Sequence, residues 1–181
     1  MNPEPLSEST PKENISLKLP EGAWKETKPP KIRGALILVA VGLIVSIVDN
    51  LVDFSVAIAP IFRSPLWERY TNPGSPEYHA QWKLVIIYDA MMVTVILFWN
   101  IVMLAFFFRK KRVFPKLASA SLPIIFLLIF ASYYLGGLIP AVAESAGYAK
   151  EETALIIKFI GLHIWVPYFL LSKRVAKTFV C

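Results

Sequence analysis

The sequence predicts an all-α integral membrane protein, built as an antiparallel bundle of four transmembrane helices with both termini in the cytoplasm. Hydrophobic residues make up 56% of the chain, and the mean hydropathy is +0.55. These residues are collected into long apolar runs rather than spread over periodic faces, which excludes an ordinary soluble domain. Basic residues gather at alternate connections between the runs, as topology signals do. The four runs cover residues 34–61, 84–108, 117–140 and 153–171.

Residues 1–33 precede the first run and differ from it in composition. They hold six Lys or Arg, five Glu and six Pro, with few apolar residues. Because this stretch has no apolar core and no cleavage site, it is not a secretory signal. Its composition is typical of a flexible segment. We therefore expect a cytoplasmic tail ahead of a transmembrane domain over residues 34–181, and an interfacial anchor around Trp24 stays open as an alternative.

The first run, residues 34–61, is long enough to cross a bilayer, because a hydrocarbon core of about 30 Å requires roughly 20 helical residues. It nevertheless contains Asp49, Asn50 and Asp53. Each carboxylate within such a helix costs about 2.5 to 3.5 kcal/mol on insertion scales. A chain that carries two of them needs a polar environment inside the bundle. The run therefore predicts a buried polar site.

The second run, residues 84–108, contains Asp89 near its start and is followed by a basic cluster. This cluster adjoins the apolar run, as cytoplasmic loops at an anionic leaflet do, so its charge does not indicate nucleic-acid binding. Fourteen basic residues fall in the tail, the middle connection and the C-terminus, against five on the other side. The positive-inside rule then places both termini in the cytoplasm. The topology-determining residues beyond the tail include Arg109, Lys110, Lys111, Arg112, Lys173 and Arg174.

The third run, residues 117–140, carries Ser132 and Gly136 four residues apart. Small residues at this spacing let helices approach closely in lipid, here chiefly within one chain. The fourth run, residues 153–171, is the shortest and contains Lys158. Residues 141–152 are expected to form a short acidic loop between these two helices.

The ionisable residues of the runs are expected to lie at a common depth. With a rise of about 1.5 Å per residue, Asp49 and Asp53 lie roughly 20 to 30 Å from the cytoplasmic end of their helix, and Asp89 and Lys158 come out at a similar level. Asp49 and Asp53 are four residues apart and share a helical face. Three carboxylates and one ammonium leave surplus negative charge, which a proton, a cation or water can compensate. The alternative is a structural salt-bridge network.

Motifs of catalysis and metal binding are missing from the sequence. Cys181 is its one cysteine, so an intrachain disulfide and a zinc–cysteine site are excluded. The chain has no Gly-rich phosphate loop, no HExxH and no GxSxG. We therefore expect no enzymatic activity, no catalytic residue, no metal site and no cofactor.

Three stretches carry a family resemblance: TNPGSPEYHAQW before the second run, FFFRKKRVFPK at its end, and IWVPYFLLSKRVAKTFV at the C-terminus. From about Gly34 to Val180 the chain resembles the bacterial inner-membrane family called domain of unknown function 2569. The resemblance implies a four-span protein without an assigned activity, with an acidic residue at the position of Asp89 and a basic residue near Lys158. The Asp49 and Asp53 pair, and the start of the first run, depart from the family pattern.

Two functions remain open from the sequence. The first is an accessory or scaffold subunit that interacts with other membrane proteins in a larger complex. The second is conduction or sensing of protons or cations through the acidic pair, as a homo-oligomer because four spans enclose little space. Under both hypotheses the protein lies in the lipid bilayer of the bacterial inner membrane, and it has no nucleic-acid partner.

Overall fold

The computed structural model describes residue 32 and residues 34–180, so the predicted tail lies almost entirely outside the described residues. The described part is helical and has no strand, which confirms the predicted all-α class. Within it, four helical segments are long and apolar enough to cross a membrane, as predicted. They span Ala35–Arg63, Trp82–Phe108 (α4), Phe114–Gly137 (α5) and Ala146–Leu171 (α7).

The first membrane segment is continuous but changes its winding after Asp53. It consists of α1 (Ala35–Asp53), a π-helical segment η1 (Phe54–Ile58) and α2 (Ala59–Arg63). The backbone N–H of Ala59 bonds to the carbonyl of Phe54, five residues back. Pro60 follows directly and has no N–H to donate, so the wider turn accommodates a break in the helical hydrogen bonding.

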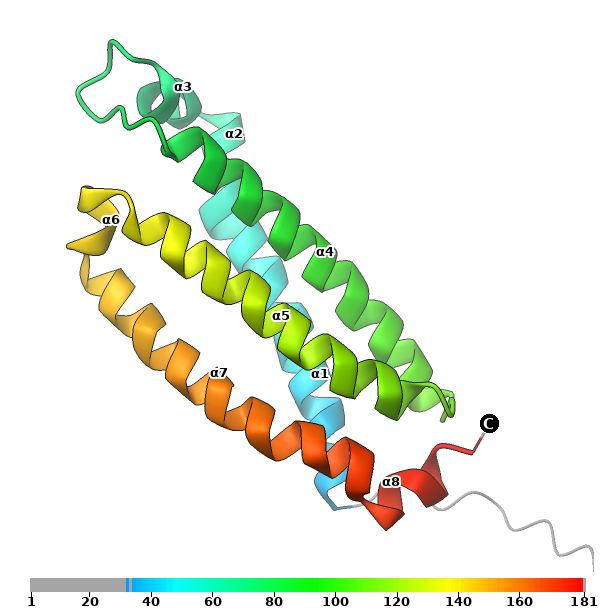
Figure 1. Cartoon of the computed structure of the whole chain (residues 1–181). Helices are drawn as coiled ribbons and strands as arrows, with labels where there is room; N and C mark the ends of the chain where they lie inside the picture. Colours follow the sequence, from blue (N-terminus) through cyan, green and yellow to red (C-terminus); the bar gives the residue numbers. More distant parts are fainter. Residues whose placement is uncertain (1–31, 33, 181) are drawn as a thin grey trace, which may run out of the picture.

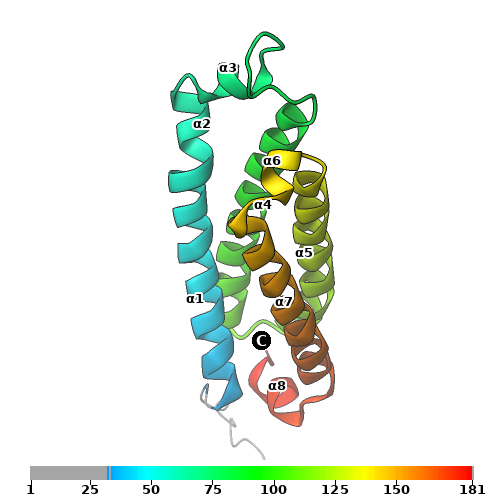
Figure 2. The same ribbon diagram turned by 90° about the vertical axis from the view of Figure 1, so that its left-hand side faces the viewer.

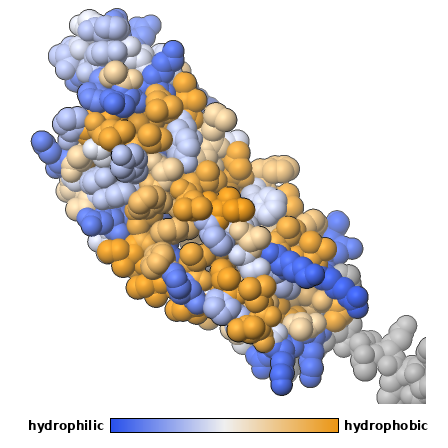
Figure 3. All heavy atoms as spheres, viewed as in Figure 1, coloured by the Kyte–Doolittle hydropathy of each residue, from blue (hydrophilic) through white to orange (hydrophobic). Residues whose placement is uncertain are grey.

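Three short helices complete the described part of the chain: α3 (Leu66–Thr71), α6 (Pro140–Ala143) and α8 (Lys173–Thr178). Figure 1 shows α3 and α6 at one end of the bundle and α8 at the other. We refer to these as the α3 end and the α8 end. Hydrophobic residues cover much of the middle of the face drawn in Figure 3, and hydrophilic residues gather toward both ends. This distribution fits a molecule whose middle lies in lipid.

The long helices pack in the order of the chain. Helix α1 packs on α4, α4 on α5, and α5 on α7. Among the described residues α7 and α1 form no comparable contact, and Figure 2 shows α1 standing apart from α7 with α4 behind them. The first and last membrane helices are therefore more loosely packed on each other than the other neighbouring helices are, although side chains of both meet at the α8 end.

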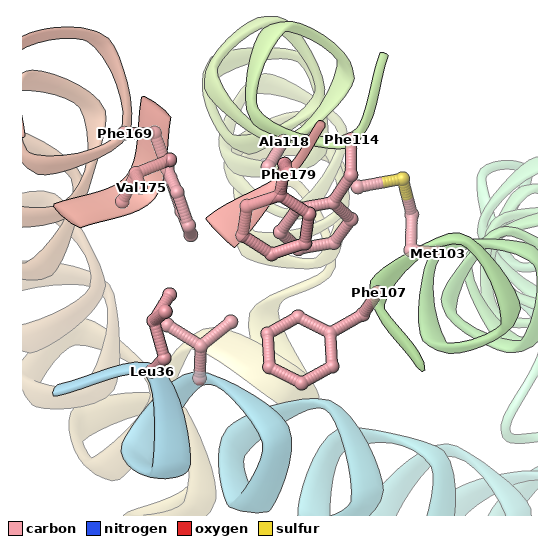
Figure 4. Close-up of a cluster of buried hydrophobic side chains, with 9 residues drawn as sticks. Leu36, Met103, Phe107, Phe114, Ala118, Phe169, Val175 and Phe179 are labelled. Carbon is pink, nitrogen blue, oxygen red and sulfur yellow. The ribbon is translucent and has the colours of Figure 1, made fainter. Parts of the chain in front are cut away.

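A cluster of buried apolar side chains closes the bundle at the α8 end (Figure 4), and we call it the aromatic cluster. Phe107 and Phe114 are fully buried, with ring centroids 5.2 Å apart, and Phe179 stacks on Phe114 at 4.8 Å. Helix α8 folds back to supply part of this packing. The members are Leu36, Val39, Met103, Phe107, Phe114, Ala118, Phe169, Val175 and Phe179.

The two ends of the described chain meet in this cluster, because Leu36 belongs to the start of α1 and Phe179 follows α8. The predicted topology residues lie at this end too, on the α4–α5 connection and on α8. Arg112 Nε donates a hydrogen bond to the carbonyl of Val180 at 2.9 Å, which ties these two segments together. That this end faces the cytoplasm stays a prediction from the positive-inside rule.

The turn after α4 ends that helix with a defined cap. Lys110 has a positive φ of 50°, and its N–H bonds to the Phe107 carbonyl at 3.0 Å. The N–H of Lys111 bonds to the Phe106 carbonyl at 3.1 Å. These two bonds form a Schellman motif, in which a left-handed residue satisfies the last carbonyls of a helix. The chain therefore reverses sharply into α5.

The last membrane helix begins earlier than predicted, at Ala146 rather than residue 153. Its N-cap is Ser145, whose side-chain oxygen accepts a hydrogen bond from the Tyr148 N–H at 3.2 Å. A serine in this position satisfies one of the free N–H groups that begin a helix. Glu151 is consequently part of α7, and most of the predicted acidic loop over residues 141–152 is helical.

Gly137 allows the close approach of α5 and α7 at the α3 end. Tyr148 of α7 stacks on Tyr133 of α5, with centroids 4.3 Å apart and planes inclined by 11°. A Cβ at Gly137 would lie 2.9 Å from Cζ of Tyr148, closer than side chains normally approach. At Gly136 an added Cβ would be in ordinary contact with Val142, at 3.6 Å. The small residues of this helix thus serve packing within one chain.

Candidate functional site

A polar cavity of about 660 Å³ lies between the membrane helices toward the α3 end. Four of the residues predicted to form a polar site line it: Asp49, Asn50 and Asp53 from α1, and Lys158 from α7. Asp49 and Asp53 share one face of α1 because they are four residues apart, and both line this space. Their side chains are exposed rather than buried, so the polar site is more open than the sequence predicts. Ser132 and Tyr133 of α5, and Glu151 of α7, complete the polar part of the lining.

The charged groups of the polar cavity are not neutralised by direct pairing. Asp49, Asp53 and Lys158 make no ion pair within 4.0 Å in the described part of the chain, where the one such pair joins Arg69 to Glu77. The structure thus shows no salt-bridge network there. Three lining carboxylates and one lining ammonium give a formal charge of −2 when all are ionised. The cavity therefore favours positively charged groups.

The Arg69–Glu77 pair lies outside the membrane helices, near α3. The hydrogen bond from the Arg69 guanidinium to Glu77, together with the charge of Glu77, raises the pKa of Arg69 above its ordinary value. The pair is exposed, so it stabilises the loop only weakly. It plays no part in the polar cavity.

Asp89 lies beside the polar cavity rather than in its lining. Ser132 Oγ donates a hydrogen bond to Asp89 Oδ1 at 2.5 Å, which joins α4 to α5. Nearby, Tyr88 Oη donates to the Leu128 carbonyl at 2.9 Å across the same helix pair. Asp89 therefore has a packing role through Ser132, and Ser132 separates it from the cavity.

Glu151 belongs to the site, although its position in the sequence predicted a loop. It lies close enough to Asp89, Lys158 and Asp53 to interact electrostatically with all three. Glu151 and Lys158 are seven residues apart, which places them on one face of a helix two turns apart. Recognising Ser145 as an N-cap would have extended the helix over Glu151 and revealed this alignment.

A network of neutral polar groups forms the floor of the polar cavity. Asn100 of α4 is buried, and its Nδ2 donates to Ser46 Oγ of α1 at 2.8 Å. Asn50 Nδ2 donates to the Ser46 carbonyl at 2.6 Å. Ser46 therefore joins α1 to α4 in the middle of the membrane, where such bonds help to fix helix packing.

A second, apolar cavity of about 250 Å³ continues from the polar cavity toward the α8 end. The two share four lining residues: Gly42, Ser46, Ile96 and Ile125. Its walls are otherwise mostly hydrophobic, and Phe114 and Phe169 at its inner end belong to the aromatic cluster. The two cavities thus form one pocket that is polar at the α3 end and apolar at the other.

One residue that lines the apolar cavity carries a polar atom that no described residue satisfies. Nε1 of Trp99, which lines this cavity, is buried and forms no hydrogen bond within the described part of the chain. A buried N–H without an acceptor costs about 1 to 3 kcal/mol, so such groups are rare in folded proteins. Among the described residues, no group of three His, Cys, Asp or Glu that could hold a metal ion occurs.

The family comparison covers most of the chain. Residues 29–180 match the family described as Protein of unknown function (DUF2569), a stretch that includes all four membrane segments and the three motifs quoted above. No curated protein and no solved structure matches the chain. The match confirms the resemblance noted in the sequence and extends it a few residues ahead of Gly34. The chain is therefore a multi-pass membrane protein that belongs to the DUF2569 family.

Proposed function

We propose that this protein is a non-catalytic accessory subunit of the bacterial inner membrane that binds a ligand in its polar cavity. Both termini are cytoplasmic in this proposal, so the polar cavity lies toward the outer leaflet. Ionisable residues within membrane helices generally mark functional sites, because their insertion is costly. Here Asp49, Asp53 and Lys158 share a cavity of about 660 Å³, a size typical of ligand pockets.

The observation that carries the proposal is that the pocket is closed at one end. Beyond the apolar cavity lie Phe107, Phe114 and Leu36, each fully buried in the aromatic cluster. An ion crossing the membrane through this subunit would have to leave the polar cavity and pass tightly packed hydrocarbon side chains. A closed pocket of this kind supports binding rather than conduction.

Proteoliposomes that contain the purified full-length protein test this proposal. We expect no proton or cation flux above that of empty vesicles when a membrane potential is imposed, and Asp49→Asn with Asp53→Asn should leave this baseline unchanged. The same double variant should still co-purify with the wild-type set of membrane proteins in mild detergent. A flux that the double variant abolishes would overturn the proposal and establish conduction through the acidic pair.

Proton or cation sensing is the second candidate function, and the surplus negative charge of the polar cavity favours it. Asp49, Asp53 and Glu151 line the cavity, and Lys158 is the one basic residue among the described residues of its lining. A bound cation would compensate their charge without crossing the aromatic cluster. Sensing requires only that occupancy changes the distance between α1 and α7, which are loosely packed on each other.

A further inference from the structure

Resting on the proposed binding function, we infer that the ligand is a phospholipid whose headgroup carries a primary amine. Its ammonium and phosphate would lie in the polar cavity, and part of one acyl chain would enter the apolar cavity. The lipid would come from the leaflet at the α3 end through the opening between α1 and α7. Three features of the pocket support this assignment: the order of its polar and apolar parts, its charges, and its lateral opening.

The order of the two cavities matches that of a lipid in a leaflet. The polar cavity lies toward the α3 end, and the apolar cavity continues from it toward the middle of the bundle, with Gly42 and Ser46 at their junction. An added Cβ at Gly42 would meet no described atom within 4 Å, so this junction is open space. A headgroup can therefore occupy one cavity while a hydrocarbon chain extends into the other.

The charges of the polar cavity match both parts of a zwitterionic headgroup. Asp49, Asp53 and Glu151 offer acceptors for a primary ammonium, which has three N–H donors. Lys158 offers a cation for the phosphate, and charge-assisted bonds of this type are the strong ones.

The lateral opening is framed by residues that belong both to the pocket and to the surface. Val45 and Val52 of α1 line the polar cavity, yet they are 49% and 52% exposed. Leu38, further along α1, lines the apolar cavity and is 62% exposed. Because these three side chains face both the pocket and the surface of the molecule, they form the edge of a path from the bilayer into the pocket.

The test measures which lipids stay bound to the detergent-purified full-length protein. The protein is equilibrated with equal amounts of dioleoyl phosphatidylethanolamine, phosphatidylcholine and phosphatidylglycerol, and the bound lipids are counted by native mass spectrometry. We expect one retained phosphatidylethanolamine molecule, preferred over the other two lipids by about tenfold. Phosphatidylcholine and phosphatidylglycerol lack the primary ammonium, and losing its hydrogen bonds to carboxylates weakens binding by that factor or more. Equal retention of the three lipids would overturn the inference.

Two variants locate the lipid in the pocket. Gly42→Phe fills the junction of the cavities and should abolish retention, whereas Val41→Phe adds the same ring on a half-exposed position outside both cavities and should leave it unchanged. Gly42→Leu, which adds less bulk, should reduce retention and serves if Gly42→Phe does not fold. Unchanged retention in the folded Gly42 variants would overturn the inference.

Two further measurements distinguish a bound lipid from a free headgroup and from a conducting pore. Phosphoethanolamine alone should not raise the thermal midpoint of the protein, and a rise that persists in Gly42→Phe would assign the site to a soluble amine instead. Flux in the proteoliposome assay would overturn the proposed function. Absent flux together with absent lipid preference would overturn the lipid assignment alone.

Discussion

Phe107→Ala is expected to destabilise the protein by about 3 to 5 kcal/mol, the usual cost of removing a buried aromatic ring. Phe107 is fully buried and contacts Phe114 and Phe179, with ring centroids 5.2 and 5.6 Å away. Its loss leaves a cavity where α4, α5 and the segment after α8 meet. The effect should appear as a large drop in the thermal midpoint in detergent micelles.

Phe98→Ala is the matched control, because Phe98 lies on the same helix and is 69% exposed. Truncation there removes contacts with lipid or detergent rather than with the core, so the midpoint should change little. Because the aromatic cluster also closes the pocket, Phe107→Ala should make the α8 end leakier to water-soluble reagents. Equal midpoints for the two variants would show that this cluster is not the structural core of the bundle.

Ser132→Ala is expected to destabilise the protein by about 1.5 to 3 kcal/mol, the value of a hydrogen bond to a charged group. The substitution leaves Asp89 Oδ1 without the Ser132 hydroxyl that it accepts from at 2.5 Å. Because Ser132 lines the polar cavity, water there replaces part of that donor, which puts the expected cost toward the lower end of this range. Chemical denaturation of the two proteins in mixed micelles measures the difference.

Two comparisons isolate that bond. Tyr88→Phe removes a neutral bond across the same helix pair, from Tyr88 Oη to the Leu128 carbonyl, and should cost about 0.5 to 1.5 kcal/mol. In an Asp89→Leu background, Ser132→Ala should cost less than about 0.5 kcal/mol, since the two residues act as a pair. An undiminished cost in that background would assign the effect of Ser132→Ala to something other than Asp89.

The membrane spans could be predicted from the sequence, because apolar runs of bilayer length rarely form anything but membrane helices. Helix ends were less predictable. Hydropathy predicts a start of the fourth run at residue 153, whereas the cap at Ser145 starts α7 at Ala146 and so adds about two turns, which carry Lys150, Glu151 and Glu152. Hydropathy detects the part of a helix in lipid, and capping decides where the helix begins.

The candidate site was predictable in only part of its membership, because Asp89 lies beside the cavity and Glu151 lines it instead. Spacing along the helices placed Asp49, Asp53 and Lys158 at one depth, and the structure puts them around one cavity. Two features depend on which helices pack together: the absence of direct ion pairs among these described residues, and the loose packing between α1 and α7. A single sequence holds no signal for that pairing, because each membrane helix is apolar on most of its faces.

The accessibility of introduced cysteines tests the closed polar pocket most directly. In a Cys181→Ser background, single cysteines replace Asp53 and Lys158 in the polar cavity, Val175 in the buried aromatic cluster, and Val56, which is 72% exposed. Neither Val175 nor Val56 lines a cavity. A membrane-impermeant thiol reagent should label the cysteines at 53 and 158 from the outer side of sealed vesicles, and should label 56 and 175 from neither side. Labelling at 175 from the outer side, or protection of 53 and 158 from both sides, would contradict a water-filled pocket that ends at the aromatic cluster.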